Sequence, residues 1–563
     1  MNLGRSTAEN GELIRATEAV HEPLPRKIVT LAFLEKQIAG SLISEQLARS
    51  LCAETNASVV LVRLEPQGGD VTIKDGPRPE LFLNGEFHIP PDFHKTDAGF
   101  HSLILGVRSD PPTPPGIASL VSQLSRHFRY VLIQTQVDEQ PAPWLFELLN
   151  RSNLAYVFLK PATGDVYHLD LVMREARARC HNGGVHVKPV ACLAQGEPIN
   201  GFDLLAQRFT SPVQTFVHGC PTLDGAKQAA PDIALGVSFR VDLRRLAREI
   251  GGCLVGLALS SGAAKGFAHV GVIQVLEENG IEVDVVAGAS MGAYVGALWA
   301  HGCNGCELER LSRELEGAWT FWTLIDPAFP PRRGFLRGFA VKRRLMRSIG
   351  QAHFADLVRP LHVVAANLAT LERVVFSSGE VATAVHASTA VPGICVPVTI
   401  DGETYTDGGI VDPLPVDILR EMGVARVIAV NVIPTPDRIR CAIEAELQLK
   451  RHHETSGLKL FRKALPLNRQ VNYFARGNVL EILMRSVHGA QIRMAEASCQ
   501  MADLVLRPEI YDDRWLDYRH PKKFITLGRE VAERHLGEIK SLVNRTEISH
   551  EPKLAPEPTA AMV

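Results

Sequence analysis

Residues 283–300 read VDVVAGASMGAYVGALWA, and this stretch decides the fold of the second half of the chain. Residues 283–287 form a strand-like run, and residues 293–300 form a run of helical character. In such a strand–turn–helix a serine lies on a sharp elbow, with its hydroxyl exposed at a helix N-terminus that favours negative charge. A glycine-rich packing turn without chemistry is also compatible with this pattern. The turn has the form Gly-x-Ser-x-Gly and consists of Gly288, Ala289, Ser290, Met291 and Gly292.

A small-residue loop lies one strand–helix unit before this elbow. Apolar residues 254–259 predict a strand, and residues 267–278 predict a helix that ends at Asn279-Gly280. The loop between them offers backbone N–H groups to an anion, either a phosphate or the oxyanion of an acyl transfer. Its position one unit before Ser290 favours the oxyanion. The candidate oxyanion-hole residues are Gly262, Ala263, Ala264, Lys265 and Gly266.

The third motif surrounds Asp407. The dipeptide Asp401-Gly402 predicts a hairpin turn between two short strands, the second of which ends at Asp407. The glycines that follow, Gly408 and Gly409, let the Asp407 carboxylate approach another backbone closely. An isolated Asp-Gly-Gly is more simply a solvated turn, so only the three motifs in this order indicate chemistry.

Together the three motifs resemble the patatin-like phospholipase family, which has a glycine-rich oxyanion loop, a Gly-x-Ser-x-Gly nucleophile and an Asp-Gly-Gly or Asp-Gly-Ala base. The resemblance runs from about residue 254 to 432 and persists to about residue 508, where MADLVLRP is similar to the last core strand of the family. The most similar subgroup is the bacterial relatives of neuropathy target esterase. The stretches that carry it are LALSSGAAKGFAHVGVIQVLEENGIEVDVVAGASMGA (257–293), ASTAVPGICVPV (387–398) and YTDGGIVDPLPV (405–416).

The resemblance implies a three-layer α/β/α hydrolase domain over residues 251–510, with Ser290 as nucleophile and Asp407 as its base. In this Ser–Asp dyad, backbone N–H groups of about residues 262–264 hold the oxyanion, and water activated by Asp407 releases the acyl group. The implied activity is that of a carboxylic ester hydrolase of the phospholipase A or lysophospholipase type. Its substrate would be a phospholipid or a lysophospholipid, with no metal and no cofactor.

Two residues depart from the family pattern and keep another interpretation open. Ser261 and Ala263 stand where the family has glycines in the oxyanion loop. Loss of one oxyanion donor costs about 10²–10³ in rate in other enzymes. The alternative is therefore a catalytically weak interaction or regulatory protein.

A Ser-His-Asp triad is a further alternative, and it requires a histidine after the acid in the chain. His488 and His520 follow Asp407, but neither lies in a convincing loop context. We interpret both of them, like His269 and His386, as structural residues.

Residues 26–180 alternate between strand-like and helix-like runs, which predicts a Rossmann-like α/β domain with a parallel sheet. The layout resembles P-loop ATPases of the partition and nitrogenase iron protein type. A phosphate loop needs glycines and a lysine at the helix start, whereas residues 34–41 read LEKQIAGS and keep only Gly40 and Ser41. We therefore expect a scaffold with a degenerate P-loop and no nucleotide binding, with a nucleotide-driven switch as the alternative. The runs are 27–33, 41–53, 58–64, 103–107, 117–128, 130–134 and 154–159.

The remaining segments are assigned by composition. Residues 1–25 are expected to form a flexible tail, 181–250 a linker region with some strands, and 511–563 a C-terminal helical segment and disordered tail. Nine basic residues between Arg438 and Arg476, with interleaved leucines, indicate either a lid or docking surface for anionic lipids or a solvated insertion. An aromatic cluster forms either the wall of an acyl pocket or ordinary core, and it comprises Trp319, Phe321, Trp322, Phe329, Phe335 and Phe339.

The composition limits the possible partners and compartments. Of 563 residues 46% are hydrophobic and 22% charged, and the net charge of −2 predicts no nucleic-acid partner. Ten scattered cysteines and a polar N-terminus favour a reducing cytoplasm. The longest apolar run, 285–300, is shorter than the roughly 20 residues of a membrane-spanning helix. We expect a cytoplasmic protein that can also lie peripherally on the inner face of the membrane.

Overall fold

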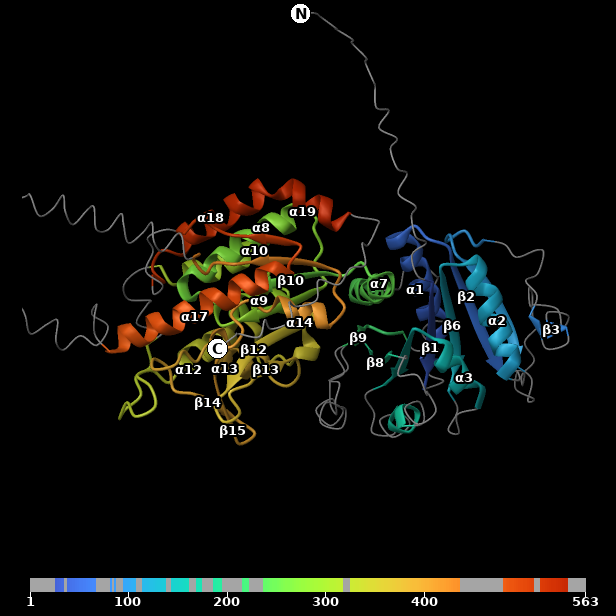
Figure 1. Cartoon of the computed structure of the whole chain (residues 1–563), viewed down its shortest axis with the longest axis horizontal. Coiled ribbons are helices and arrows are strands. Elements are labelled where there is room, and N and C mark those ends of the chain that lie inside the picture. The colour runs from blue at the N-terminus through green and yellow to red at the C-terminus, as the bar shows by residue number, and fades with distance from the viewer. Residues whose placement is uncertain are drawn as a thin grey trace, which may run out of the picture.

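The computed structural model describes most of the chain as two α/β units (Figure 1). The basic segment between Arg438 and Arg476, the aromatic residues at 319, 321 and 322, and both predicted tails at 1–25 and 545–563 lie outside the described residues. In the described part of the chain, no helix has both the length and the apolar character needed to cross a bilayer. The described residues are 26–34, 38–66, 82–83, 86–87, 95–107, 114–137, 143–160, 169–174, 186–194, 215–221, 236–316, 325–435, 479–510 and 517–544.

The N-terminal sheet has seven strands among the described residues, each parallel to its neighbours, in the order β5-β2-β6-β1-β7-β8-β9. A separate ribbon pairs β3 (Phe82–Leu83) with β4 (Glu86–Phe87). The predicted parallel sheet is therefore confirmed. The strands are β1 (Lys27–Phe33), β2 (Val59–Pro66), β5 (His101–Val107), β6 (Tyr130–Gln136), β7 (Leu154–Leu159), β8 (His186–Leu193) and β9 (Thr215–His218). The helices are α1 (Gly40–Thr55), α2 (Pro114–His127), α3 (Pro143–Arg151) and α7 (Val237–Gly251).

Alternate residues of the N-terminal strands face two different helical layers, because successive side chains of a strand point to opposite faces. Leu31 and Phe33 of β1 lie in an apolar cluster with α1 and α7. Ala32 lies on the other face in a cluster with α3, and α2 covers the same face. This unit is thus a three-layer α/β/α structure.

The region 181–250 contributes more to this unit than the predicted linker. Strands β8 and β9 continue the N-terminal sheet beyond β7, and α7 packs its apolar side against α1. Pro189 within β8 is unfavourable in the interior of a sheet, where its missing N–H weakens the ladder. This proline and the frequent glycines nearby explain why the sequence pattern resembles a linker.

The C-terminal sheet has the order β14-β15-β12-β11-β10-β16-β17, with β13 paired to β12. Its centre, from β12 to β17, is parallel, and β13, β14 and β15 add antiparallel pairs at one edge. The predicted hairpin turn at Asp401-Gly402 connects β14 and β15, with a φ of 51° and 86° at the two residues. The strands are β10 (Val255–Leu259), β11 (Val285–Ala289), β12 (Leu361–Asn367), β13 (Arg373–Phe376), β14 (Val398–Ile400), β15 (Glu403–Asp407), β16 (Arg426–Val430) and β17 (Leu504–Leu506).

Helices cover both faces of the C-terminal sheet. One face packs against α8, α9, α18 and α19, and the other packs against α14 and α17. Phe524 and Ile525 of α18 are buried in the same cluster as α8, so the predicted C-terminal helical segment is part of this core. The helices are α8 (Ala268–Glu278), α9 (Met291–His301), α10 (Gly305–Arg313), α12 (Phe339–Ile349), α13 (Val381–Ser388), α14 (Val416–Glu421), α17 (Val479–Met501), α18 (Pro521–Arg534) and α19 (Leu536–Val543), with 3₁₀ turns η2 (Ala263–Phe267), η4 (Phe354–Asp356) and η5 (Gly408–Ile410).

The two sheets meet through the amino ends of their strands, with α7 between them (Figure 1). A cavity of about 650 Å³ at the junction is lined by Lys27 and Leu154, which begin β1 and β7. It is also lined by Val285 and Leu361, which begin β11 and β12. The carboxyl ends of the strands in both sheets therefore point away from the junction.

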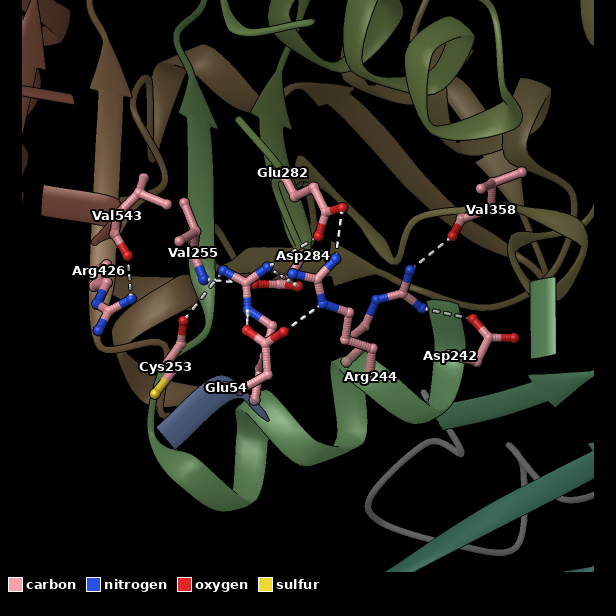
Figure 2. A network of polar contacts seen from close by, with 12 residues as sticks. Glu54, Asp242, Arg244, Cys253, Val255, Glu282, Asp284, Val358, Arg426 and Val543 are labelled. Atoms are coloured by element: carbon pink, nitrogen blue, oxygen red, sulfur yellow. Dashed lines mark hydrogen bonds and ion pairs between the residues drawn. The ribbon is translucent and has the colours of Figure 1, made fainter. Parts of the chain in front are cut away.

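Arginines on the polar side of α7 tie the two sheets together (Figure 2). Arg244 is hydrogen-bonded to Glu54 of α1 and donates to Glu282 ahead of β11 at 2.8 Å. The buried Arg248 lies 3.4 Å from the buried Asp284 carboxylate, which in turn accepts the Val255 N–H at 2.7 Å. The network thus reaches the first residue of β10, whose far end leads into the candidate oxyanion loop.

Candidate active site

Ser290 occupies the turn between β11 and α9, as the strand–turn–helix pattern predicts. Its φ of 52° and ψ of −118° are values that non-glycine residues rarely adopt. A Cβ atom at Gly292 would lie 2.2 Å from the Leu259 carbonyl oxygen, so only glycine lets α9 start this close to β10. Gly288 and Ala289 end β11, and Met291 begins α9. The elbow is therefore held in its strained form by the packing around it.

Asp407 ends β15, where it pairs with Ala365 of β12, and its carboxylate faces the Ser290 elbow. The Ser290 hydroxyl donates a hydrogen bond of 2.6 Å to Asp407 Oδ2. The other carboxylate oxygen, Oδ1, accepts the Gly409 N–H at 2.7 Å. A Cβ atom at Gly408 would lie 2.2 Å from the Val364 carbonyl oxygen, so this glycine allows the close approach of β15 to β12. The fold thus brings together two residues that are 117 positions apart in the sequence.

The electrostatic environment makes Asp407 a stronger base than an exposed aspartate. Burial raises the pKa of its carboxyl to about 6, although the hydrogen bonds from the Ser290 hydroxyl and the Gly409 N–H oppose the rise. At neutral pH the group is still ionised, because its pKa remains below 7. The charged Asp407 carboxylate can therefore accept a proton from Ser290 at neutral pH.

The predicted oxyanion loop lies beside this pair as the 3₁₀ turn η2. The Lys265 N–H donates to the Gly262 carbonyl at 3.1 Å, so the N–H groups of Gly262, Ala263 and Ala264 precede the first hydrogen bond of the turn. The first N–H groups of a helical turn have no acceptor inside it and are available to an anion. Ala263 has a φ of 49°, so an alanine here adopts the backbone region that favours glycine.

The loop is also fixed from behind. The Ser261 N–H donates to the Pro413 carbonyl at 2.8 Å, and the Ser260 hydroxyl accepts the Val432 N–H at 3.0 Å. The Ser290 N–H donates to the Ser388 hydroxyl at 2.9 Å. Ser388, at the end of α13, is a site residue that the sequence motifs did not single out. Its only sequence signal was its place in the stretch ASTAVPG.

A cavity of about 300 Å³ opens onto Ser290, Asp407 and the oxyanion loop. One wall comes from α17, far along the chain, which contributes Arg485, His488 and Gln491. The sequence motifs did not predict the part played by this helix. The same helix also contributes Val487, and the remaining walls are mostly apolar and comprise Val391, Pro392, Ile410, Val432, Ile433 and Pro434.

Within the described part of the chain, no histidine is hydrogen-bonded to Ser290 or Asp407. The buried His269 bonds to the Ser260 carbonyl at 2.9 Å behind the loop, and His386 bonds to a carbonyl beneath α12. His520 pairs with an adjacent aspartate at the surface. His488 lines the cavity, where burial lowers the pKa of its imidazole and the nearby Lys265 charge lowers it further. Among the described residues, the Ser290 hydroxyl is therefore paired with the Asp407 carboxylate and not with a histidine.

The sequence of this region is similar to known proteins. Residues 257–420 match the family model described as patatin-like phospholipase. A protein named lysophospholipase NTE1 from Pyricularia oryzae is 31% identical over 258 residues, which are 45% of this chain and 17% of that protein. Its namesake from Candida albicans is 27% identical over 323 residues, 54% of this chain and 23% of that protein. The chain therefore spans about a fifth of the length of these relatives.

A solved structure of a ParA family ATPase from Chlorobium tepidum is also similar, with 11% identity and a TM-score of 0.31. That similarity covers 40% of this chain and 98% of the ATPase chain.

Proposed function

Because residues 257–420 make the chain a member of the patatin-like phospholipases, in the group related to neuropathy target esterase, we propose that it is a serine lipid acyl hydrolase. In this proposal Ser290 is the nucleophile and Asp407 is the general base. The observation that carries the proposal is the 2.6 Å hydrogen bond from the Ser290 hydroxyl to the buried Asp407 carboxylate. The open N–H groups of Gly262, Ala263 and Ala264 beside it support the same chemistry.

The reaction begins when Ser290 Oγ attacks the carbonyl carbon of a lipid ester and its proton passes to Asp407. The negative charge on the carbonyl oxygen is held by the N–H groups of residues 262–264 and by the positive end of η2. When the C–O bond to the alcohol breaks, the proton on Asp407 moves to the leaving oxygen. The acyl group is then esterified to Ser290.

In the second half of the reaction a water molecule replaces the alcohol. Asp407 takes a proton from this water as it attacks the acyl carbon, and the same oxyanion groups hold the new tetrahedral intermediate. When the bond to Ser290 breaks, the proton returns to Ser290 Oγ and the free fatty acid leaves. Asp407 is ionised again and the cycle is closed.

The substrate class follows from the walls of the cavity. Apolar residues such as Val391, Ile410 and Val432 line most of it and favour an acyl chain, while Arg485 and His488 add polar groups on one side. The relatives from Pyricularia oryzae and Candida albicans are named lysophospholipases. We therefore assign phospholipids or lysophospholipids as substrates, hydrolysed at the cytoplasmic face of a membrane by a peripherally bound protein.

The N-terminal unit acts in this proposal as a Rossmann-like scaffold without bound nucleotide. Ile38 and Ala39 are buried at the start of α1, where a phosphate loop would present glycines and a lysine. Gly40 and Ser41 then open the helix without a basic neighbour in the described residues of the loop. A test is equilibrium dialysis of the full chain against ATP with Mg²⁺, in which we expect no saturable binding.

The test of the activity is fatty-acid release from lysophosphatidylcholine micelles and phosphatidylcholine vesicles. Wild type should turn over at least one of them, and Asp407→Asn should reduce kcat by roughly 10³–10⁴-fold. A fluorophosphonate should label wild type but not Ser290→Ala. If wild type is no faster than these variants, the altered positions Ser261 and Ala263 have disabled the oxyanion loop. The chain is then a catalytically weak interaction protein.

The pH dependence provides a separate check of the base. Since the pKa of Asp407 is about 6, kcat/KM should fall about tenfold for each pH unit below that value as the carboxyl becomes protonated. The measurement is kcat/KM on a water-soluble ester from pH 4 to pH 8. An acid limb centred near pH 4 would contradict the buried environment of the base.

A further inference from the structure

Three phenylalanines of the aromatic cluster after the nucleophile helix lie among the residues that the structure describes. They are neither core nor pocket wall, which corrects both expectations for these three residues. Phe329 is 90% exposed, Phe339 53% and Phe335 40%, and none of the three lines the catalytic cavity. The physical reason is that residues 326–337 leave the core as a narrow finger. Soluble proteins rarely expose several large aromatic side chains together unless they bind something there.

The finger is held firmly at its base. Its two sides are joined by hydrogen bonds from the Ala328 N–H to the Phe335 carbonyl and from the Arg337 N–H to the Asp326 carbonyl, both at 2.8 Å. The Asp326 carboxylate accepts the N–H groups of Gly338 and Ala340 and so caps the start of α12. The exposed tip, residues 329–333, is therefore presented by an ordered support.

The finger and the start of α12 carry a strong excess of positive charge. Between residues 325 and 350 the chain has seven arginines and lysines and a single acid, Asp326. Five of the arginines are exposed, and no carboxylate among the described residues lies at ion-pair distance from them. Lys342 and Arg344, by contrast, pair with Glu380 and Glu314. The five exposed arginines are Arg332, Arg333, Arg337, Arg343 and Arg347.

The finger is attached directly to the rim of the catalytic cavity. The N–H groups of Phe335 and Leu336 both donate to the Ile394 carbonyl, at 2.8 and 2.9 Å. The Ile394 N–H in turn donates to the carbonyl of Val391, which lines the cavity together with Pro392. A surface that binds the finger therefore lies next to the cavity rim.

We infer that the 326–337 finger and the start of α12 form the surface that docks this protein onto an anionic lipid bilayer. This inference rests on the proposed lipid hydrolase function and names the partner of the same site. Phe329 enters the interface between headgroups and acyl chains, while the exposed arginines bind the negative headgroups around it. The combination of an exposed aromatic tip and an unbalanced positive charge fits such a membrane better than it fits a protein partner. A protein interface of this charge would need a matching acidic surface.

The inference is tested by co-sedimentation of the full chain with vesicles, in a Ser290→Ala background so that no lipid is hydrolysed. Phosphatidylcholine vesicles with and without phosphatidylserine separate the apolar from the charged contribution. Phe329→Ala should weaken binding to both kinds at least about tenfold, because a phenylalanine buries roughly 150–250 Å² on insertion. Arg332→Ala should weaken binding only to the anionic vesicles, by about fivefold, and added salt should reduce this difference.

Two matched variants away from the finger, in the N-terminal half of the chain, serve as controls. Val237→Ala removes another exposed apolar side chain at the start of α7, and Arg126→Ala removes another exposed arginine at the end of α2. Both should bind vesicles like the parent. If they weaken binding as much as Phe329→Ala and Arg332→Ala do, the effect is not local and the inference is wrong.

The outcomes also separate the docking surface from the proposed activity. Phe329→Ala with Ser290 restored should still hydrolyse a short-chain, water-soluble ester, because the Phe329 side chain lies outside the cavity. Vesicle binding without any hydrolysis would contradict the proposed function and leave the docking surface standing. Hydrolysis of the soluble ester by a wild type that binds no vesicles would overturn the docking surface and indicate a protein partner instead.

Discussion

Strand β1 of the N-terminal sheet and strand β11 of the C-terminal sheet both run into a loop and a helix at a carboxyl edge. After β11 the chain turns at Ser290, whose hydroxyl faces Asp407 and an open cavity. After β1 the chain buries Ile38 and Ala39, and the ring of Phe33 stacks on that of Phe158 at 4.6 Å. The same strand–loop–helix arrangement therefore ends in a polar crevice in one sheet and in apolar packing in the other.

This difference shows what the arrangement itself provides. A parallel sheet creates a crevice at its carboxyl edge wherever neighbouring connections diverge, but the chemistry comes from the groups that remain in it. In the C-terminal sheet the Ser290 hydroxyl meets the Asp407 carboxylate there, and Gly262 and Ala263 line the same cavity. In the N-terminal sheet the described residues of the corresponding loop are mostly apolar, so we expect no catalysis and no phosphate binding at that edge.

The sharpest test of the comparison replaces, one at a time, the two serines that follow these strands with alanine. Ser290→Ala should lower kcat by at least about 10⁴-fold, because it removes the proposed nucleophile. Ser41→Ala, at the exposed start of α1, should leave kcat within about twofold, since surface substitutions away from a site have small effects. Fatty-acid release measured side by side decides this, and a large loss in Ser41→Ala would mean that the N-terminal edge takes part in function.

The second prediction concerns the junction between the sheets. Arg248→Ala should lower the free energy of unfolding by about 3 kcal/mol, because it leaves the buried Asp284 carboxylate without its cation. The side chain of Arg248 is 5% exposed, whereas that of Arg244 is 45% exposed. Arg244→Ala should therefore cost less than about 1 kcal/mol. Urea unfolding curves provide the measurement, and equal losses would show that burial does not distinguish the two contacts.

The third prediction concerns the folding stability that is lost because the ionised Asp407 carboxylate is buried. The native pKa of Asp407, about 6, is higher than the 3.8 of the unfolded chain. The native state therefore binds the proton more tightly, and wild type loses stability as the pH rises from about 4 to about 6. Asp407→Asn lacks this penalty and should be more stable than wild type by about 3 kcal/mol above pH 6, and by nothing below pH 4. A variant that is less stable than wild type at pH 8 would contradict this environment.

The smallest predicted effect concerns the altered oxyanion loop. Ala263 already adopts a φ of 49°, so glycine at this position should keep the same loop conformation. Ala263→Gly should therefore change kcat by less than about threefold, while relief of left-handed strain and greater freedom of the unfolded chain largely cancel in stability. An increase of tenfold or more in kcat would show that the alanine impairs the donors.

Local patterns were sufficient to predict the parts of the molecule that are close in sequence. The elbow at Ser290, the hairpin before Asp407 and the alternation of strands and helices from residue 27 to 159 all follow from short-range periodicity and turn residues. The order of the three motifs then suggested that they belong to one site. The 2.6 Å hydrogen bond between Ser290 and Asp407 is a tertiary contact. It depends on the pairing of β15 with β12, which local sequence patterns do not show.

Other parts depended on packing that a sequence does not display. Arg485, His488 and Gln491 are spaced at one face of a helix, but nothing in that spacing says that α17 packs on α14 and turns this face to the cavity. Phe329 has the large apolar side chain that is typical of a core residue. It is exposed to solvent because it lies at the tip of the 326–337 finger. The sequence likewise did not show that the strands expected within the linker region 181–250 extend the N-terminal sheet. Pro189 is tolerated in β8 because it pairs only with Val157 of β7, one residue before β9 joins the other edge at Val190.

The position of α7 has a consequence for how the protein is made. During synthesis the chain leaves the ribosome from its N-terminus, and N-terminal units generally fold first. The apolar side of α7, with Phe239, Leu243 and Leu246, completes the core around α1 as soon as residue 251 has emerged. Its arginines should then already be in place when Asp284 emerges. We therefore expect the N-terminal unit to offer the later half of the chain a ready counter-charge for its buried acid.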